Sequence, residues 1–265
     1  MVTRRVNGFI VKVTDSMKYD DVKEDLTQAY VDILKKSQLS QIYIDQDLSG
    51  IFLACPSEAY FSSSKKLMVI GQETRSWRNS TCAIKNYNDL GKGSIVESMR
   101  VANNFNRRKP GNSKFRQRYK EASIRICSDS PSPSEAAVWA NQFCISYKGG
   151  SPINSKSFDL VKEMSYKLLR AQMSILKPDI ALFFTGSGRD RFIKECFPSY
   201  ETLKVFEPRR LWSFKVDETT CFRTNHPRWG QSSSYIDQAI EMAESHNNRL
   251  HSDRFSAASR LQTGA

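Results

Sequence analysis

The stretch FDLVKEMSYKLLRAQMSILKPDIALFF, residues 158–184, is the clearest indication of the fold class of this chain. Its first part, 158–176, repeats leucine and methionine at helical spacing and predicts an amphipathic helix. Pro178 and Asp179 end that helix, and the apolar run 180–184 predicts a buried strand. Because another apolar run at 136–146 precedes the helix, the pattern predicts a strand, helix, strand crossover, the connection that parallel strands need.

The run LMVI at 67–70 is wholly apolar and stops at Gly71, as expected of a central parallel strand buried on both faces. We therefore expect an α/β fold: a three-layer α/β/α sandwich around a mostly parallel sheet of four to five strands. The other expected elements are strands at 7–14, 203–206, 212–216 and 221–224, helices at 23–36, 94–104, 189–196 and 232–247, and a helix or strand at 42–53.

The length of 265 residues and the hydrophobic content of 39% suit one sizeable core. We expect a single domain over 1–248, with a basic insertion at about 98–126 and a polar C-terminal tail at 249–265.

Positive charge predominates: 40 Lys and Arg stand against 28 Asp and Glu, a formal net charge of +12. Such a charge favours encounter with polyanions, so nucleic acid is the first partner to consider. A basic run from Arg107 to Lys120, in a stretch that has no acid between Glu97 and Glu121, is interleaved with Phe115 and Tyr119. It predicts phosphate contacts, with a solvated surface helix as the alternative. Its basic residues are Arg107, Arg108, Lys109, Lys114, Arg116, Arg118 and Lys120.

The six cysteines lie far apart, without a C-x-x-C pair, which predicts buried reduced thiols and neither a metal site nor another cofactor. The N-terminal stretch MVTRRVNGFIVKV lacks the sustained apolar run of a secretion signal, and no segment approaches the length of a membrane span. We expect a cytoplasmic monomer that does not engage a membrane. The cysteines are Cys55, Cys82, Cys127, Cys144, Cys196 and Cys221.

Three polar clusters follow predicted strands: Gly71-Gln72-Glu73, Asn141 and His226-Pro227. In open α/β sheets, ligands bind beyond the carboxyl ends of the strands, so a carboxylate, an amide and an imidazole can converge there. Each also has a structural interpretation, as a helix cap, a strand-end amide and a partly buried histidine. Their joint placement favours a site.

The motif VIGQET at 69–74 resembles the water-activating motif of the uracil-DNA glycosylase superfamily. NHPRWG at 225–230 is similar to the second motif of that superfamily, a His-Pro dipeptide that opens a loop inserted into DNA. The segment 179–197 resembles the strand, glycine turn and helix that precede this loop. The resemblance covers about residues 65–245.

The resemblance implies an enzyme that breaks the bond between a base and its sugar in DNA. Glu73 would then activate water and stabilise the cation-like sugar, and His226 would donate to the base oxygen that gains negative charge. Asn141 would read the edge of the flipped base. Arg228 and Trp229 would fill the gap in the duplex, with core packing as the alternative for Trp229. The other implied contacts are Gly71, Gln72 and Trp77 to the base and Ser187 to DNA.

The chain also departs from the family pattern, because Glu73 replaces the usual aspartate. The proline and the tyrosine that exclude bulky pyrimidines are absent, and 74–77 reads Thr-Arg-Ser-Trp instead. A pocket lined by Arg75, Ser76, Trp77 and Asn79 would admit a larger, more polar base. The expected base is therefore a modified pyrimidine, with glucosylated hydroxymethylcytosine of phage DNA, excised in antiphage defence, as one candidate.

Three other interpretations stay open. One is a repair glycosylase for uracil in DNA, and another is a DNA-binding module that keeps the fold without the chemistry. The third is a nucleotide- or RNA-binding protein in which the turn 185–188 holds phosphate. That turn is too short for a P-loop and lacks its lysine.

Overall fold

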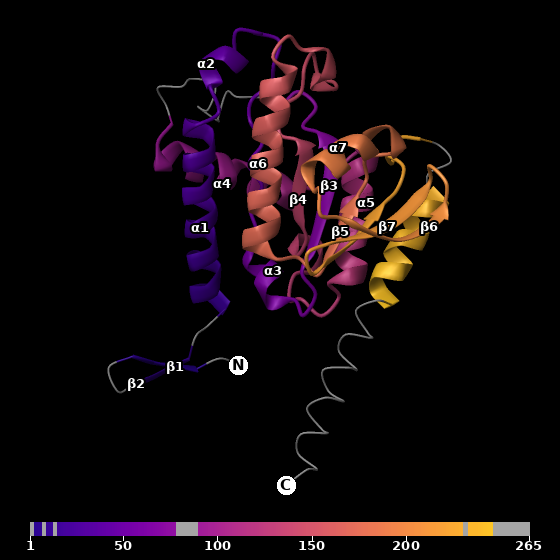
Figure 1. Cartoon of the computed structure of the whole chain (residues 1–265). Coiled ribbons are helices and arrows are strands. Elements are labelled where there is room, and N and C mark those ends of the chain that lie inside the picture. Colours follow the sequence, from indigo (N-terminus) through magenta and orange to yellow (C-terminus); the bar gives the residue numbers. More distant parts are fainter. Residues whose placement is uncertain (1–2, 7–8, 13–14, 78–89, 230–232, 246–265) are drawn as a thin grey trace.

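Four parallel strands form the centre of the protein (Figure 1). They are seen in a computed structural model that describes residues 3–6, 9–12, 15–77, 90–229 and 233–245. In spatial order they are β4 (Val138–Phe143), β3 (Leu67–Glu73), β5 (Ile180–Phe183) and β8 (Thr219–Arg223). Because helices cover both faces of these strands, their residues are buried along almost the whole length, which explains the unbroken apolar runs in the sequence.

Two antiparallel strands, β7 (Leu211–Val216) and β6 (Glu201–Glu207), continue the sheet beyond β8. The central sheet therefore has six strands in the order β4-β3-β5-β8-β7-β6, which is more than the four to five expected. All residues of β6 are exposed, as suits a strand at the edge of the sheet.

Helices cover both faces of the sheet, which confirms the α/β class and is compatible with three layers (Figure 1). Helix α6 (Phe158–Leu176) joins β4 to β5, whereas α4 (Lys92–Arg107) and α5 (Lys114–Ile126) join β3 to β4. The two crossovers run in opposite directions along the sheet. Since such crossovers are right-handed, α6 and α5 lie on opposite faces.

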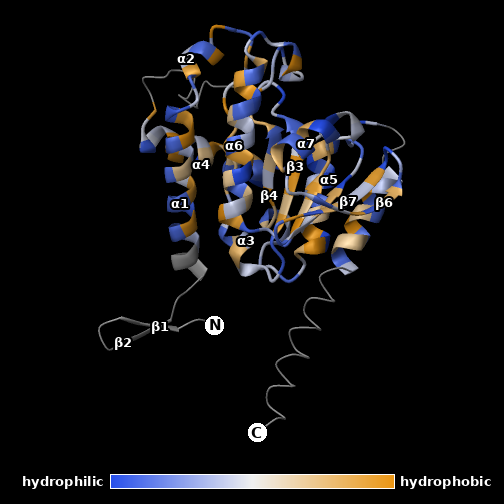
Figure 2. Cartoon of the chain, in the orientation of Figure 1, coloured by the Kyte–Doolittle hydropathy of each residue, from blue (hydrophilic) through white to orange (hydrophobic). Residues whose placement is uncertain are grey.

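The remaining helices complete these layers. Helix α1 (Asp15–Lys35) packs on α6, and α7 (Asp190–Cys196) follows β5. A helix over 233–245 lies beside α5, where Arg125 Nη2 meets Glu244 Oε2 at 2.6 Å. Figure 2 shows apolar residues concentrated on the central strands and on the inward sides of the helices. The short elements are α2 (Leu39–Ile42), α3 (Glu58–Ser62) and the 3-10 helices η2 (Pro133–Glu135), η3 (Pro152–Asn154) and η4 (Ser187–Arg189).

Several predicted elements differ from the structure. The strand expected at 7–14 is β2 (Phe9–Lys12), which pairs with β1 (Thr3–Val6) in a separate hairpin. Apart from the end of α2, the region 42–53 is irregular. The segment at about 98–126, expected as a basic insertion, contains the end of α4 and α5, and α5 buries Tyr119, Ala122 and Ile126 in the core.

Strand β3 does not stop at Gly71 but continues through Glu73, because Gly71 pairs with Asn141 and Glu73 with Phe143 of β4. The site candidates of the first motif therefore lie on a strand rather than in a loop.

The described cysteines are buried and unpaired, as predicted; Cys82 lies outside the described residues. None of the helices seen in the described part of the chain is both long enough and apolar enough to cross a membrane.

Candidate active site

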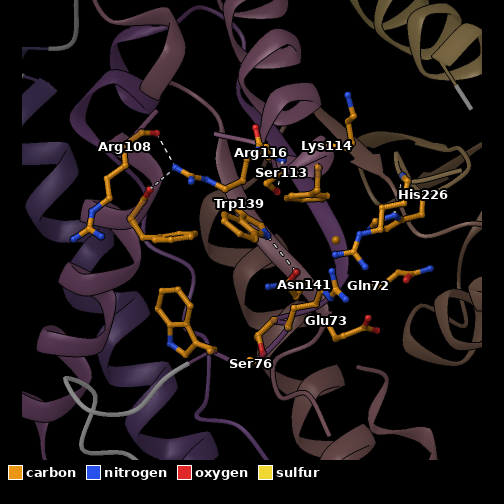
Figure 3. Close-up of a pocket in the computed structure, with 18 of the residues that line it drawn as sticks. Gln72, Glu73, Ser76, Arg108, Ser113, Lys114, Arg116, Trp139, Asn141 and His226 are labelled. Carbon is orange, nitrogen blue, oxygen red and sulfur yellow. Dashed lines mark hydrogen bonds between the residues drawn. The ribbon is translucent and has the colours of Figure 1, made fainter. Parts of the chain in front are cut away.

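A cavity of about 940 Å³ opens at the carboxyl ends of the parallel strands (Figure 3). The ends of β3 and β4 and the turn after β8 supply its floor, and α4 and α5 supply one wall. Glu73, Asn141 and His226, the three residues expected to converge, all line it. The predicted position of the site is thus where the structure brings these side chains together.

Glu73 is the carboxylate of the cavity, at the end of β3. Its Oε2 accepts a hydrogen bond of 2.9 Å from Arg189 Nη2, and each of these side chains is only 10% exposed. Burial raises the pKa of Glu73 above its ordinary value, while the positive charges of Arg189 and Arg75 oppose that rise. A 2.9 Å contact between buried groups is the geometry of an ion pair. Within the described structure Oε1 makes no hydrogen bond, and Glu73 lines the cavity.

The partner, Arg189, was not identified from the sequence. It ends η4, and its guanidinium lies over the rings of Phe143 and Phe192, at 5.3 and 5.9 Å from their centroids. Gln142 Nε2 donates to its carbonyl oxygen at 3.2 Å. The available signal was the first arginine after the glycine turn that follows a core strand, a position close to the strand ends.

His226 follows β8 and faces Glu73 across the cavity (Figure 3). Its Nδ1 accepts a hydrogen bond of 3.2 Å from the backbone N–H of Arg228. Burial, together with the charges of Arg75 and Arg189, lowers the pKa of His226 to about 4. The ring is therefore neutral at pH 7, and because Nδ1 is an acceptor, its proton is on Nε2. His226 thus offers a neutral N–H donor.

Asn141 lies on β4 and is 6% exposed. Trp139 Nε1 donates to Asn141 Oδ1 at 3.2 Å, and an indole N–H can only donate, so the amide orientation is fixed by chemistry. The amide nitrogen, Asn141 Nδ2, therefore takes no part in the contact with Trp139, and it is buried without a partner among the described residues. A buried amide donor is costly unless a ligand accepts from it.

Gly71 lets the amide and an aromatic ring approach the strand. A Cβ at this position would lie 2.6 Å from Asn141 Oδ1 and 3.1 Å from Phe115 Cε2. The ring of Phe115 stacks on His226 with centroids 6.3 Å apart and an angle of 21°. Phe115, predicted only as an aromatic residue within the basic run, is therefore a further residue of the site.

Gln72 lines the cavity but also has a structural contact, since its Nε2 donates to the carbonyl oxygen of Thr185 at 2.5 Å. This bond ties β3 to the glycine turn after β5.

The loop after β3 has an unusual backbone. Arg75 and Ser76 both have positive φ, 44° and 58°, which is strained for residues with side chains. Neighbouring groups hold the loop in place: Ser76 N–H donates to Ser146 Oγ at 2.9 Å, and Thr74 Oγ1 lies 3.1 Å from Ser49 Oγ. The result places the exposed Arg75 near both Glu73 and His226. Asn79 lies outside the described residues.

The residues expected to contact DNA fall into two groups. The first group lines the cavity and consists of Arg108, Lys114, Arg116, Arg228 and Trp229. The Trp229 side chain is 67% exposed, which excludes core packing for it.

The other expected contacts lie elsewhere. Arg107 pairs with Glu135 at 3.1 Å, and Lys120 Nζ donates to the carbonyl oxygen of Ser134 at 2.7 Å. Lys109 is exposed, and Ser187 is in η4, outside the cavity lining.

Arg118 has a structural role instead, because its Nη1 contacts Glu121 Oε2 at 2.6 Å and Asp237 Oδ1 at 2.8 Å. It joins α5 to the helix 233–245. The counter-charges of the basic run therefore come in part from the protein itself.

No protein-family model matches the chain, and no curated protein matches it.

Proposed function

We propose that this protein is a DNA glycosylase of the uracil-DNA glycosylase type, which hydrolyses the N-glycosidic bond of a base flipped out of DNA and leaves an abasic site. The observation that carries the proposal is the meeting of the Glu73 carboxylate and the His226 imidazole in one cavity. The motifs that resemble this superfamily supply one carboxylate and one neutral hydrogen-bond donor to that cavity, as the reaction needs.

In the proposed reaction, Glu73 and His226 each stabilise a different charge that develops as the bond breaks. As the bond between the base and C1′ breaks, positive charge develops on the sugar and negative charge on the base. Glu73 stabilises the sugar cation and takes the proton of the attacking water through Oε1, while Arg189 holds Oε2. His226 Nε2–H donates to the base oxygen, and the proton taken from water ends on the departing base. Water thereby adds a hydroxyl to C1′ and a proton to the base.

A base larger than uracil fits the cavity best. About 940 Å³ lies near the top of the range of ~300–1,000 Å³ that holds drug-sized ligands, far beyond a bare pyrimidine. We therefore favour a modified pyrimidine over uracil, with glucosylated hydroxymethylcytosine of phage DNA as one candidate. In that case the protein serves antiphage defence rather than repair, and acts in the cytoplasm as a monomer on DNA.

The rim of the cavity supports a DNA substrate. Lys114 and Arg228 are exposed basic residues, and the exposed ring of Trp229 stands beside them in the lining. Such groups can hold the backbone and occupy the gap that a flipped base leaves.

The test is abasic-site formation. Single- and double-stranded oligonucleotides carrying uracil, hydroxymethylcytosine or glucosylated hydroxymethylcytosine are incubated with the protein and then cleaved with alkali. We expect strand cleavage for at least one modified cytosine and a rate about 10²–10⁴ lower for Glu73→Gln, because the general base is lost. DNA affinity of this variant should stay within about twofold.

The matched control is Glu163→Gln, a glutamate on α6 whose exposed side chain pairs with Lys167 and lies outside the cavity lining. It should cleave as the parent does. No abasic product with any base would refute the enzyme and leave the DNA-binding module. Cleavage of uracil alone would instead support the repair enzyme.

A further inference from the structure

The cavity extends well past the proposed catalytic end. A row of ring contacts marks its length: Phe115 stacks on His226, Trp139 lies 5.0 Å from Phe115, Phe105 lies 5.9 Å from Trp139, and Trp77 lies 5.5 Å from Phe105. In Figure 3, Arg108 and Arg116 lie on the far side of Trp139 from Glu73 and His226. We call this far part, lined by Trp77, Val101, Phe105, Arg108 and Arg116, the annex.

The annex offers hydrogen-bond donors. Trp77 Nε1 is buried and has no partner within the described structure. Arg116 uses Nη2 to donate to the carbonyl oxygens of Phe105 and Arg108, at 3.0 and 2.7 Å, and its guanidinium lies 4.4 Å from the centroid of the Phe105 ring. Its Nε and Nη1 make no hydrogen bond in the described structure and remain available.

Positive charge in the annex is not balanced. The described lining of the whole cavity holds five basic residues and one acid, and that acid, Glu73, is at the opposite end and paired with Arg189. Arg108 is exposed and makes no ion pair with a described residue. Donors with surplus positive charge bind oxygen acceptors that carry negative charge.

We propose that the annex recognises a substituent on the flipped pyrimidine that carries acceptor oxygens and a negative charge. This inference rests on the proposed function and adds the chemistry of the group that the base bears. The aromatic rings pack against the carbon part of the substituent, while Arg108, Arg116 and Trp77 Nε1 donate to its oxygens.

A backbone phosphate of a neighbouring nucleotide offers the same acceptor oxygens and negative charge as the proposed substituent. The two sources differ in one respect: a phosphate is present next to every base, whereas the substituent is present only on the modified one. The experiment must therefore hold the DNA constant and change only the base.

Three otherwise identical oligonucleotides serve this purpose. Their target base is plain uracil, uracil with a carboxyvinyl group at C5, or uracil with the corresponding carboxamide, which matches the carboxylate in size but not in charge. Excision is measured in single turnover. Binding of the Glu73→Gln variant to the same three DNAs, by fluorescence anisotropy, gives a second readout that needs no chemistry.

We expect the parent to excise, and Glu73→Gln to bind, the carboxylate at least about tenfold better than the carboxamide, a difference typical of a charged hydrogen bond. Arg108→Gln should reduce this preference to about twofold. Trp77→Phe, which keeps the ring and removes the N–H, should impair both substituted bases more than plain uracil. Arg100→Gln is the control, since Arg100 is on the same helix as much of the annex, pairs with Glu97 and is outside the cavity lining.

The outcomes separate the two proposals. Abasic product without a preference for the carboxylate overturns the annex and keeps the glycosylase. Preferential binding of the carboxylate without abasic product keeps the annex, and it overturns the glycosylase if the uracil and modified-cytosine oligonucleotides of the first test also give no abasic product. An equal loss on all three DNAs in Arg108→Gln assigns Arg108 to the backbone and overturns the inference.

Discussion

The buried end and the exposed rim of the same cavity are built in opposite ways. At the buried end, Glu73 and Arg189 are each 10% exposed, and Asn141 is 6% exposed. Each of these side chains is held by a partner inside the protein. At the rim, Trp229 is 67% exposed, and Lys114 and Arg228 are exposed basic residues.

This difference separates chemistry from binding. Charges and donors held in a site that excludes water can stabilise a transition state without rearrangement, so changes there should alter the rate. Charges in water act on the DNA backbone and are screened by salt, so changes at the rim should alter affinity. Substitutions at either end can therefore test whether the two roles are separate.

After Glu73→Gln, the greatest loss of rate is expected for His226→Phe. Phenylalanine can keep the stacking on Phe115 but has no N–H for the departing base, so the single-turnover rate should fall about 10²–10³-fold. His226→Gln retains a donor and should recover part of the loss. If His226→Phe weakens DNA affinity and leaves the rate unchanged, the buried end is not where the chemistry occurs.

Gly71→Ala should disturb the buried end through packing. Its Cβ would meet Asn141 Oδ1 and Phe115, and overpacking of this kind costs about 1–3 kcal/mol. The free energy of unfolding, from urea denaturation, should fall by this amount. Gly93→Ala in α4 is the control, because nothing lies within 4 Å of its Cβ; an alanine there should be neutral or stabilising. Equal effects of the two changes would show that Gly71 does not limit the packing.

The sequence predicted the parallel part of the fold because those strands leave a local signal. Burial on both faces requires unbroken apolar runs, and α6 was predicted with the bounds it has. The end of β3 was misplaced, since a glycine usually marks a break and only the register with β4 shows why the strand continues. The edge strand β6 was predicted only over 203–206 although it runs from Glu201 to Glu207, because its ends are polar and all its residues are exposed, so that burial leaves no pattern there.

For the site, the sequence identified residues that follow strands but not the contacts between them. Glu73, Asn141 and His226 were predicted to converge because parallel strands end at one edge. The pairing of Glu73 with Arg189, the tautomer of His226 and the orientation of Asn141 depend on neighbours remote in the chain. For the same reason the sequence did not reveal the ion pair of Arg118, since its partner Asp237 is on another helix.

The buried end should also respond to pH. The pKa of His226 is lowered to about 4 from 6.5, so between these values the unfolded chain binds a proton that the folded chain does not. Through this residue, stability is complete above pH 6.5 and decreases as the pH falls toward 4. In urea unfolding at several pH values, His226→Phe should therefore lose less stability than the parent over this window. NMR titration gives a direct check, and an imidazole that titrates near pH 6.5 would contradict a buried neutral donor.

The smallest expected effects are at the rim, where Arg228→Ala and Lys114→Ala should weaken DNA binding without changing the single-turnover rate at saturation. Removing one cation that binds a phosphate should reduce the slope of log affinity against log salt by about one. Arg118→Ala removes the same charge from a side chain that pairs with Glu121 and Asp237, so it should cost about 1 kcal/mol of stability or less and leave the salt slope unchanged. The expected difference in salt slope between the rim variants and Arg118→Ala depends on what each basic side chain contacts, because all three variants lose the same charge. If all three variants changed the slope equally, long-range attraction alone would explain DNA binding, and the rim would bind no phosphate directly.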